Sequence, residues 1–491
     1  MKNYLKITLA AAVLTLMGCE PEFDNPVTTE GYYTAGSADF STYVAVGNSL
    51  TSGYADGALY ITGQENSYPN IMAQQFAFVG GGEFTQPLMA DNLGGLLLNG
   101  TQVASNRLVL AADAMGNPTG PVTLEGNPTT EVTTSANGPF NNMGVPGAKS
   151  FHLVTPGYGA FNPFYARFQT SATASILEDA VSLNPSFFTL WIGSNDILGY
   201  ATSGGSGVDQ TGNLDPATYG PNDITDANVF AAALNQQVTA LNASASGGVL
   251  VNLSDVTSIP YFTTVPAQSI PLDAATAAAV NAQFALYNTQ VLPLLVQLQV
   301  ITQAEAGARM VNFEEGINFP IISDDDLTDL SQILQGPPAN LPPPIANLLG
   351  QLRQATADDL ILLPASSVLG TLANPADPLS VIGVAVPLVD QLVLTTTEQG
   401  RVATASAAYN ATIQGLAAAN DLAYVDARSE LAQLTQGGIA YDGGTLTSDY
   451  ITGGSFSLDG VHPTSRGYAH VANILIRAIN AKYGATVPQV N

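Results

Sequence analysis

The chain has 491 residues, of which 12 are Lys or Arg and 39 are Asp or Glu, so its formal net charge is -27 at pH 7. Such an excess of acidic residues would repel phosphate groups, which excludes nucleic acid as the expected partner. The single cysteine excludes an intramolecular disulfide framework. A hydrophobic fraction of 46% is sufficient for a large core, so we expect the chain to fold.

The amino-terminal residues have the pattern of an export signal. Two lysines precede an apolar run over residues 7–17, which is too short to span a bilayer. The tetrapeptide LMGC that ends at Cys19 resembles the bacterial lipobox, whose cysteine becomes lipidated. This resemblance implies a signal peptide over residues 1–18 and a lipid anchor, such as palmitate, on Cys19. A cleaved signal followed by an unrelated cysteine is the alternative interpretation.

Residues 19–40 follow the predicted signal and begin with an acidic stretch that contains proline. We interpret them as a tether between the membrane and a folded domain. The lipobox resemblance implies a location in the bacterial cell envelope, anchored by lipid in the outer membrane and either periplasmic or surface-exposed. No later segment is long and apolar enough to predict a membrane-spanning helix.

Short apolar segments then alternate with helical ones. Strands are predicted at residues 41–46, 187–192, 249–253 and 422–425. A helix is predicted over residues 228–242, and residues 463–483 have apolar side chains at the spacing of one helix face. This alternation predicts an α/β fold, a three-layer α/β/α sandwich with a mainly parallel central sheet.

Two segments interrupt this alternation and are predicted to be insertions into a domain that covers residues 41–485. Residues 80–138 are rich in Gly, Asn and Thr, whereas residues 260–401 combine leucine-rich runs with clusters of proline. We expect the second insertion to be largely helical. The two insertions match no motif that indicates a function of their own.

Three short polar motifs follow predicted strands or precede the last predicted helix. They are GNSLTSG with Ser49, GSND with Asn195, and DGVH with Asp459 and His462. The carboxyl ends of parallel strands meet at one edge of a sheet, so motifs far apart in sequence can converge there. A nucleophilic serine needs a base, and the base needs a group that orients it. His462 is the candidate base for Ser49, and Asp459 is close enough in sequence to hold the second ring nitrogen.

Two further positions are candidates for stabilising an oxyanion. Asn195 offers a side-chain amide donor. The segment NMGVPGA, residues 142–148, contains glycines whose N–H groups can approach an oxyanion without obstruction by a side chain. Each motif alone is also explained by an ordinary turn or helix cap. The chain has only three histidines, so the ordered set of motifs indicates hydrolase chemistry more strongly than any one of them.

In the order Ser, Gly, Asn and His, these motifs resemble the blocks of the SGNH (GDSL-type) hydrolase family. The resemblance covers about residues 41–483 apart from the insertions, and it matches Ser49, Gly147, Asn195 and His462 one by one. Gly147 is preferred to the earlier glycine of its segment because the family's block spans the distance from its asparagine to this position. One departure is the residue before the serine, which is Asn in this chain and Asp in the family.

The resemblance implies a flavodoxin-like strand order and a serine ester hydrolase that works through an acyl-enzyme. Ser49 is then the nucleophile, His462 the base and acid, and Asp459 the residue that orients the imidazole. Gly147 and Asn195 then belong to the oxyanion hole.

The substrate class is left open by the sequence, which allows a small-molecule, lipid or glycan ester. Residues 327–394 are apolar enough to form a lid over an acyl pocket, which favours a lipase-like acylhydrolase. A helical buttress is the alternative role for this segment. An acetylesterase acting on polysaccharide and a non-catalytic binding lipoprotein on the same fold are the alternative functions.

The remaining candidate ligands are interpreted as structural. His152 and His470 are expected to pack or to form hydrogen bonds within the fold. We expect no cofactor and no metal, because the sequence contains no closely spaced His or Cys cluster. The acidic run of residues 324–326 lacks the spacing of a calcium loop and is interpreted as the start of a helix near Leu327.

Overall fold

The computed structural model describes residues 31–337, 339–441 and 443–490. Cys19 and the predicted signal peptide lie outside these residues, whereas the end of the predicted tether lies within them. Phe40 is buried and stacks on Phe76, and the N–H of Ser37 donates to the carbonyl oxygen of Tyr483. The folded domain therefore begins before the predicted boundary at residue 41.

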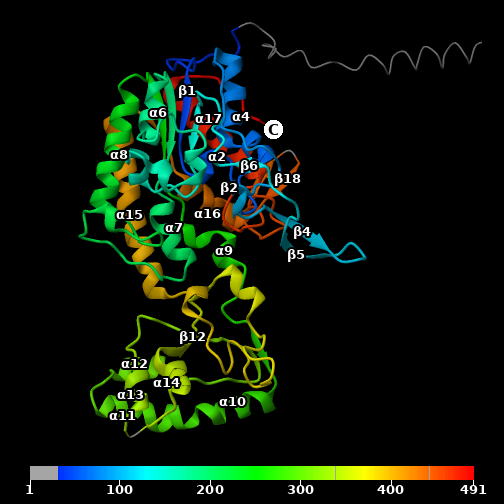
Figure 1. Cartoon of the computed structure of the whole chain (residues 1–491), viewed down its shortest axis with the longest axis vertical. Helices are drawn as coiled ribbons and strands as arrows, with labels where there is room; N and C mark the ends of the chain where they lie inside the picture. The colour runs from blue at the N-terminus through cyan, green and yellow to red at the C-terminus, as the bar shows by residue number, and fades with distance from the viewer. Residues whose placement is uncertain (1–30, 338, 442, 491) are drawn as a thin grey trace, which may run out of the picture.

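Five parallel strands form the central sheet (Figure 1). Their spatial order is β16 (Ala423–Val425), β9 (Gly247–Val251), β8 (Phe187–Trp191), β1 (Tyr43–Gly47) and β7 (Asn142–Gly144). Numbered along the chain, these five strands have the order 2-1-3-4-5 when read from β7, which is the flavodoxin-like order.

Helices cover both faces of this sheet, because successive side chains of each strand point to opposite faces. Val44 and Val46 of β1 share one apolar cluster with helices α6 (Ile176–Ser182), α8 (Ala227–Asn242) and α15 (Thr396–Ala419). Tyr43 and Ala45 share the other with α4 (Tyr68–Phe76) and α17 (Ser465–Tyr483). The predicted α/β/α sandwich with a parallel sheet is confirmed.

The strand β7 is the one member of the sheet that the sequence patterns did not predict. It contains three residues and pairs with β1 through Ala45 and Gly47. A segment of this length is too short to show the alternation that marks a strand. The predicted helices 228–242 and 463–483 correspond to α8 and α17.

The first insertion adds small sheets at one side of the domain. Its β2 (Leu96–Leu98) pairs with β3 (Thr101–Ala104) and β6 (Thr130–Glu131). A hairpin of β4 (Leu108–Ala112) and β5 (Pro118–Thr123) projects away from the central sheet (Figure 1).

The second insertion forms a separate lobe with apolar clusters of its own (Figure 1). Its helices are α10 (Ala274–Leu286), α11 (Leu292–Gln297), α12 (Gln303–Ala308), α13 (Ser331–Gln335) and α14 (Pro343–Gly350). Its two-stranded sheets pair β10 (Ile270–Leu272) with β11 (Gly316–Asn318), β12 (Ile321–Ser323) with β13 (Leu352–Gln354), and β14 (Leu360–Ile361) with β15 (Val393–Leu394).

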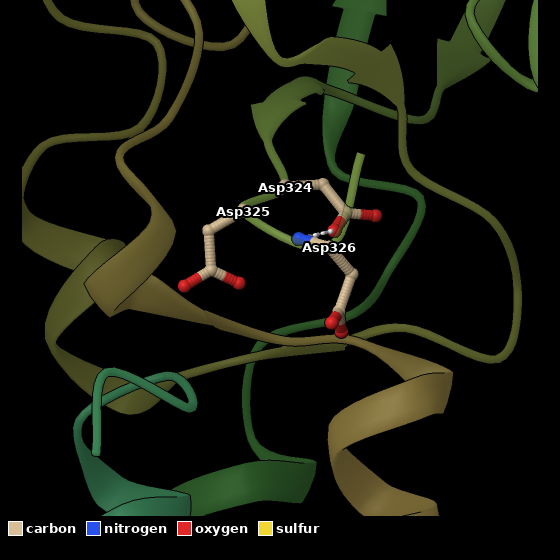
Figure 2. Close-up of side chains that lie close together, drawn as sticks. All are labelled: Asp324, Asp325 and Asp326. Carbon is tan, nitrogen blue, oxygen red and sulfur yellow. Dashed lines mark hydrogen bonds between the residues drawn. The ribbon is translucent and has the colours of Figure 1, made fainter. Parts of the chain in front are cut away.

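The predicted helix start near Leu327 is wrong. The three aspartates follow β12 in a turn, and the next helix, α13, begins at Ser331. Figure 2 shows this turn, in which the N–H of Asp326 donates to Asp324 Oδ1 at 3.0 Å. Short side-chain acceptors of this kind compete with helix formation by binding nearby backbone N–H groups.

The other helices are α2 (Ser49–Ser52), α3 (Ile61–Glu65), α5 (Pro163–Ala166), α7 (Asn195–Thr202), α9 (Pro260–Thr263) and α16 (Ala427–Gly437), and the last hairpin pairs β17 (Ile439–Tyr441) with β18 (Gly444–Leu446). Among the helices of the described residues, none is long and apolar enough to cross a bilayer.

Candidate active site

Ser49 begins the short helix α2 directly after β1. Two glycines permit this tight junction. A Cβ atom at Gly47 would lie 2.2 Å from Thr51 Oγ1, and one at Gly144 of β7 would lie 2.3 Å from the backbone nitrogen of Ser52. Glycine at these two positions therefore lets α2 press against β7 and places Ser49 at the carboxyl edge of the sheet.

Asn48, which stands where the family pattern has Asp, caps this helix. Its Oδ1 accepts a hydrogen bond from the N–H of Leu50 at 3.0 Å. Its Nδ2 is buried and has no hydrogen-bond partner among the described residues. The departure from Asp therefore keeps the capping oxygen and adds a buried amide donor beside the serine.

The structure brings Ser49, His462 and Asp459 into one chain of hydrogen bonds. Ser49 Oγ lies 2.9 Å from His462 Nε2, and His462 Nδ1 lies 2.8 Å from Asp459 Oδ2. A carboxylate can only accept, so Nδ1 carries the proton of that bond and Nε2 is left to accept the proton of the serine hydroxyl. This arrangement allows the imidazole to deprotonate the serine.

Asp459 accepts five hydrogen bonds. Its Oδ1 binds Ser457 Oγ and the N–H groups of Val461 and His462, and its Oδ2 binds the N–H of Gly57 and His462 Nδ1. Burial raises the pKa of Asp459, but the charge and hydrogen bonds of His462, with the N–H of Val461, outweigh burial and lower this pKa to about 2. Asp459 is therefore ionised at neutral pH and able to stabilise a protonated His462.

Three residues support this arrangement and were not predicted from the sequence. They are Ser457, Asp56 and Tyr54. Ser457 accepts from the N–H of Asp56 while donating to Asp459, and so joins the histidine loop to the loop after α2. The ring of Tyr54 lies 4.8 Å from the ring of His462, measured between centroids. Burial and then the charge of Asp459 raise the pKa of Tyr54, which stays neutral beside the imidazole. The only sequence signal was their position within a few residues of Ser49 or Asp459.

Asn195 and Gly147 lie in segments that are joined to each other. Asn195 begins α7, and its Nδ2 donates one hydrogen bond to the carbonyl oxygen of Ala148 at 3.0 Å. Nδ2 carries a second hydrogen, so the amide retains donor capacity. Gly147 has a φ of +77°, a left-handed conformation that favours glycine, and a Cβ there would meet nothing within 4 Å. Glycine is therefore required here by backbone conformation and not by lack of space.

Residues 145–150, which contain Gly147, are held by hydrogen bonds at both ends. The N–H of Val145 donates to the carbonyl oxygen of Gly47 at 3.0 Å, which ties it to β1. Asp196 is fully buried and accepts from both the N–H and the hydroxyl of Ser150, at 2.8 and 2.7 Å. Within the described residues, the N–H groups of Ser49 and Gly147 bind no other residue, so both remain available as donors.

An apolar cavity of about 130 Å³ adjoins Ser49 and His462. It follows the carboxyl edge of the sheet, where it is lined by Trp191 of β8, Val251 of β9 and Val425 of β16. The other walls come mainly from α16, α17 and the last hairpin, through Leu431, Leu434, Ile439, Leu446, Ile474 and Leu475. No sequence motif indicated this cavity, because its lining is distributed over distant segments.

None of the residues that line this cavity belongs to residues 260–401, so the expected lid is not one of its walls. The insertion instead supports the loop that carries the histidine. The N–H of Tyr261 donates to the carbonyl oxygen of Gly460 at 2.9 Å, and a Cβ at Gly460 would lie 3.0 Å from Leu363 Cδ2. These contacts agree with the alternative interpretation, a buttress.

The other two histidines have different surroundings. His152 accepts from the N–H of Lys149 and stacks on Tyr158, and burial followed by the charge of Lys149 lowers its pKa to about 4. It has a structural role and does not line the cavity. His470, which we expected to pack within the fold, lines the cavity with Glu430, whose Oε2 lies 3.7 Å from His470 Nε2.

Comparisons with known proteins give weak likenesses. No family model matches the chain, and no curated protein matches its sequence. An acetylxylan esterase from Geobacillus stearothermophilus is similar in structure at 10% identity and a TM-score of 0.31, covering 93% of this chain and 100% of the esterase. An extracellular lipase from Streptomyces rimosus is similar at 10% identity and a TM-score of 0.29, covering 90% of this chain and 98% of the lipase. Both TM-scores are below 0.5, so neither likeness indicates the function of this chain.

Proposed function

We propose that this protein is a serine ester hydrolase of the SGNH (GDSL-type) family. The observation that carries the proposal is the chain of hydrogen bonds from Ser49 through His462 to Asp459 at the mouth of an apolar cavity. Nucleophile, base and orienting carboxylate are the three roles that acyl transfer through a serine requires. The ordered resemblance of the four sequence motifs to the family supports the same assignment.

The reaction would proceed through an acyl-enzyme. Ser49 Oγ attacks the ester carbonyl and transfers its proton to His462 Nε2, while Asp459 stays ionised and stabilises the imidazolium. The oxyanion accepts hydrogen bonds from the N–H groups of Ser49 and Gly147 and from Asn195 Nδ2. His462 returns the proton to the departing alcohol. It then takes a proton from a water molecule, which attacks the acyl-enzyme and releases the acid.

The cavity favours an acyl group larger than acetyl. An apolar protein cavity of about 150 Å³ holds benzene, so a cavity of similar size fits an acyl chain of about four to six carbons. The cavity passes three neighbouring strands, β8, β9 and β16, which together span about 10 Å at the usual strand spacing. We therefore propose short- to medium-chain acyl esters as the substrate class, in preference to acetylated polysaccharide.

A series of p-nitrophenyl esters from acetyl to decanoyl tests this substrate class. We expect kcat/KM to rise to a maximum at butanoyl to hexanoyl, because each buried CH₂ contributes about 0.8 kcal/mol. The Ala427→Phe variant places a ring beside β16, at the far end of the cavity. Its kcat/KM for hexanoyl ester should fall by about 10–100-fold, since several CH₂ groups lose their site, while that for acetyl ester stays within about twofold.

The matched control is Ala440→Phe, which adds the same ring to an exposed position of β17. It should leave the whole chain-length profile unchanged. A parent enzyme that prefers acetyl esters throughout the series would contradict the acyl-pocket assignment and favour an acetylesterase.

We also propose that the protein is held in the outer membrane of a bacterial cell envelope by lipid on Cys19. The support is the lipobox resemblance and the fact that Cys19 is the only cysteine in the chain. Labelled palmitate fed to expressing bacteria should enter the parent chain and not the Cys19→Ser variant. Equal labelling of both chains, or of neither, would contradict the anchor.

A further inference from the structure

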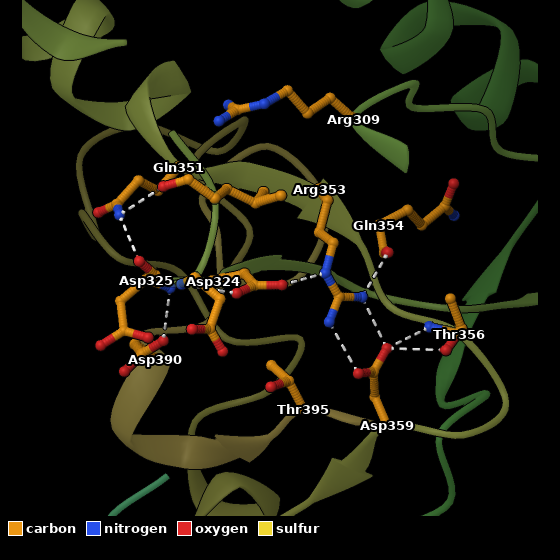
Figure 3. A network of polar contacts seen from close by, with 12 residues as sticks. Arg309, Asp324, Asp325, Gln351, Arg353, Gln354, Thr356, Asp359, Asp390 and Thr395 are labelled. Carbon is orange, nitrogen blue, oxygen red and sulfur yellow. Dashed lines mark hydrogen bonds and ion pairs between the residues drawn. The ribbon is translucent and has the colours of Figure 1, made fainter. Parts of the chain in front are cut away.

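A cluster of three carboxylates lies where the second insertion meets the sheet domain. Asp325 follows β12, Asp390 lies in a short turn of helix before β15, and Glu398 lies in the first turn of α15. One carboxylate oxygen from each lies within 4.8 Å of the other two. The N–H of Asp325 also donates to Asp390 Oδ1 at 3.1 Å, as Figure 3 shows.

Glu398 is the most deeply buried member of this cluster. Its side chain is fully buried, and its Oε2 accepts from the N–H of Thr395 at 2.6 Å, which caps α15. Its Oε1 is buried and has no hydrogen-bond partner among the described residues. A Cβ at residue 205, which is glycine with a φ of +73°, would lie 1.9 Å from this oxygen. Glycine at residue 205 therefore leaves the space that Glu398 Oε1 occupies.

The basic residues near this cluster are bound to other carboxylates. Arg353 pairs with Asp324 and, through two nitrogens, with Asp359 (Figure 3). Arg401 pairs with Asp326. Within the described residues, no Lys, Arg or His forms an ion pair with the three carboxylates of the cluster.

Two carboxylates of the cluster are shielded from solvent, since Asp390 is 8% exposed and Glu398 is 0% exposed. The buried carboxylates thus lack the positive partner that such groups need in order to be ionised at neutral pH.

We propose that Asp325, Asp390 and Glu398 bind one Ca²⁺ ion at this junction. Calcium takes six to eight oxygen ligands at about 2.3–2.6 Å, so oxygens up to about 5 Å apart can share one ion. The three carboxylates supply anionic oxygens, and Asp325 is exposed, which lets water complete the shell. The ion would offset most of the negative charge of the three carboxylates, bind Glu398 Oε1 and join β12, the residues before β15, and α15. The site is independent of the proposed ester hydrolysis.

Calcium binding is tested on the full chain after removal of metal with EDTA. In titration calorimetry, Ca²⁺ should bind at one equivalent with a dissociation constant of about 10⁻⁴ M or tighter. At 5 mM Ca²⁺, the thermal unfolding temperature should rise by about 5 °C, because the ion binds the folded state alone. Glu398→Gln and Asp390→Asn keep the shape of each side chain, and each should weaken binding by at least about tenfold.

Two further variants make the test specific. Asp325→Asn changes an exposed side chain and should also weaken binding. Glu315→Gln changes an exposed carboxylate of the same insertion and should leave binding unchanged. The absence of a Ca²⁺ effect on the parent would show that the carboxylates share protons and would overturn the proposal. Equal Ca²⁺ binding by Glu398→Gln, or equal affinity of the parent for Mg²⁺, would also overturn it.

Discussion

The Ser49→Ala variant is expected to lose at least about 10⁴-fold in kcat for a p-nitrophenyl butanoate substrate, because it lacks the hydroxyl that would form the acyl-enzyme. The fold should be unaffected, since among the described residues the hydroxyl of Ser49 binds His462 alone, and its loss leaves an alanine at the start of α2. Measurement of kcat together with the thermal unfolding temperature separates these two effects. Reaction with a fluorophosphonate probe should label the parent at Ser49 and leave the variant unlabelled.

The matched control for this variant is Ser52→Ala. Ser52 lies in the same helix, and its hydroxyl donates to the carbonyl oxygen of Ser49 at 2.9 Å, away from His462. This variant should keep probe labelling and kcat within about tenfold of the parent, since it loses one hydrogen bond of about 1 kcal/mol. Undiminished turnover by Ser49→Ala would contradict the nucleophile assignment. A parent that neither turns over esters nor reacts with the probe would favour a non-catalytic binding protein.

The Arg353→Met variant is expected to lower the free energy of unfolding of the second insertion by about 3–5 kcal/mol, the usual cost of removing one partner of a buried ion pair. Arg353 donates to Asp359 through two nitrogens at 2.7 Å each, and also to Asp324. Burial raises the pKa of Asp359, but the hydrogen bonds and charge of Arg353 outweigh it and leave this pKa below its usual value. Without the arginine, two buried carboxylates lose their positive partner.

Urea unfolding followed by proteolysis within residues 264–395 would measure this effect, because the insertion has apolar clusters of its own. The control is Arg428→Met, which removes an exposed arginine that lies 3.9 Å from Asp255. A surface pair of this kind contributes about 0–1 kcal/mol, so the control should unfold near the parent's midpoint. If the two variants unfold at the same urea concentration, the buried network does not stabilise the insertion.

Sequence reasoning located Ser49, Asn195, Asp459 and His462 because each follows a recognisable strand or precedes a recognisable helix. Parallel strands place their carboxyl ends together, so the order of the motifs was sufficient to predict that they converge. The structure confirms the α/β sandwich and brings Ser49, His462 and Asp459 into contact. Their catalytic roles stay predictions until the variants are measured.

The features that sequence reasoning missed depend on contacts between distant segments. The cavity beside Ser49 is lined mainly from β8, β9, β16, α16, α17 and the last hairpin, none of which carries a local signal for a pocket. The carboxylate of Asp325 meets Asp390 and Glu398, which are 65 and 73 positions away, so the run of three aspartates alone pointed to a helix start. Only the tertiary fold shows which acidic residues lie close to one another.

The hydrogen bond between Ser49 and His462 joins residues 413 positions apart. A growing polypeptide therefore carries its serine through most of synthesis without a base to activate it. The site is completed only when α17, which begins three residues after His462, packs on the sheet beside α4. The appearance of ester hydrolysis would then show that the whole domain has folded. A chain that ends anywhere before residue 459 would not hydrolyse esters, however well its first strands had folded.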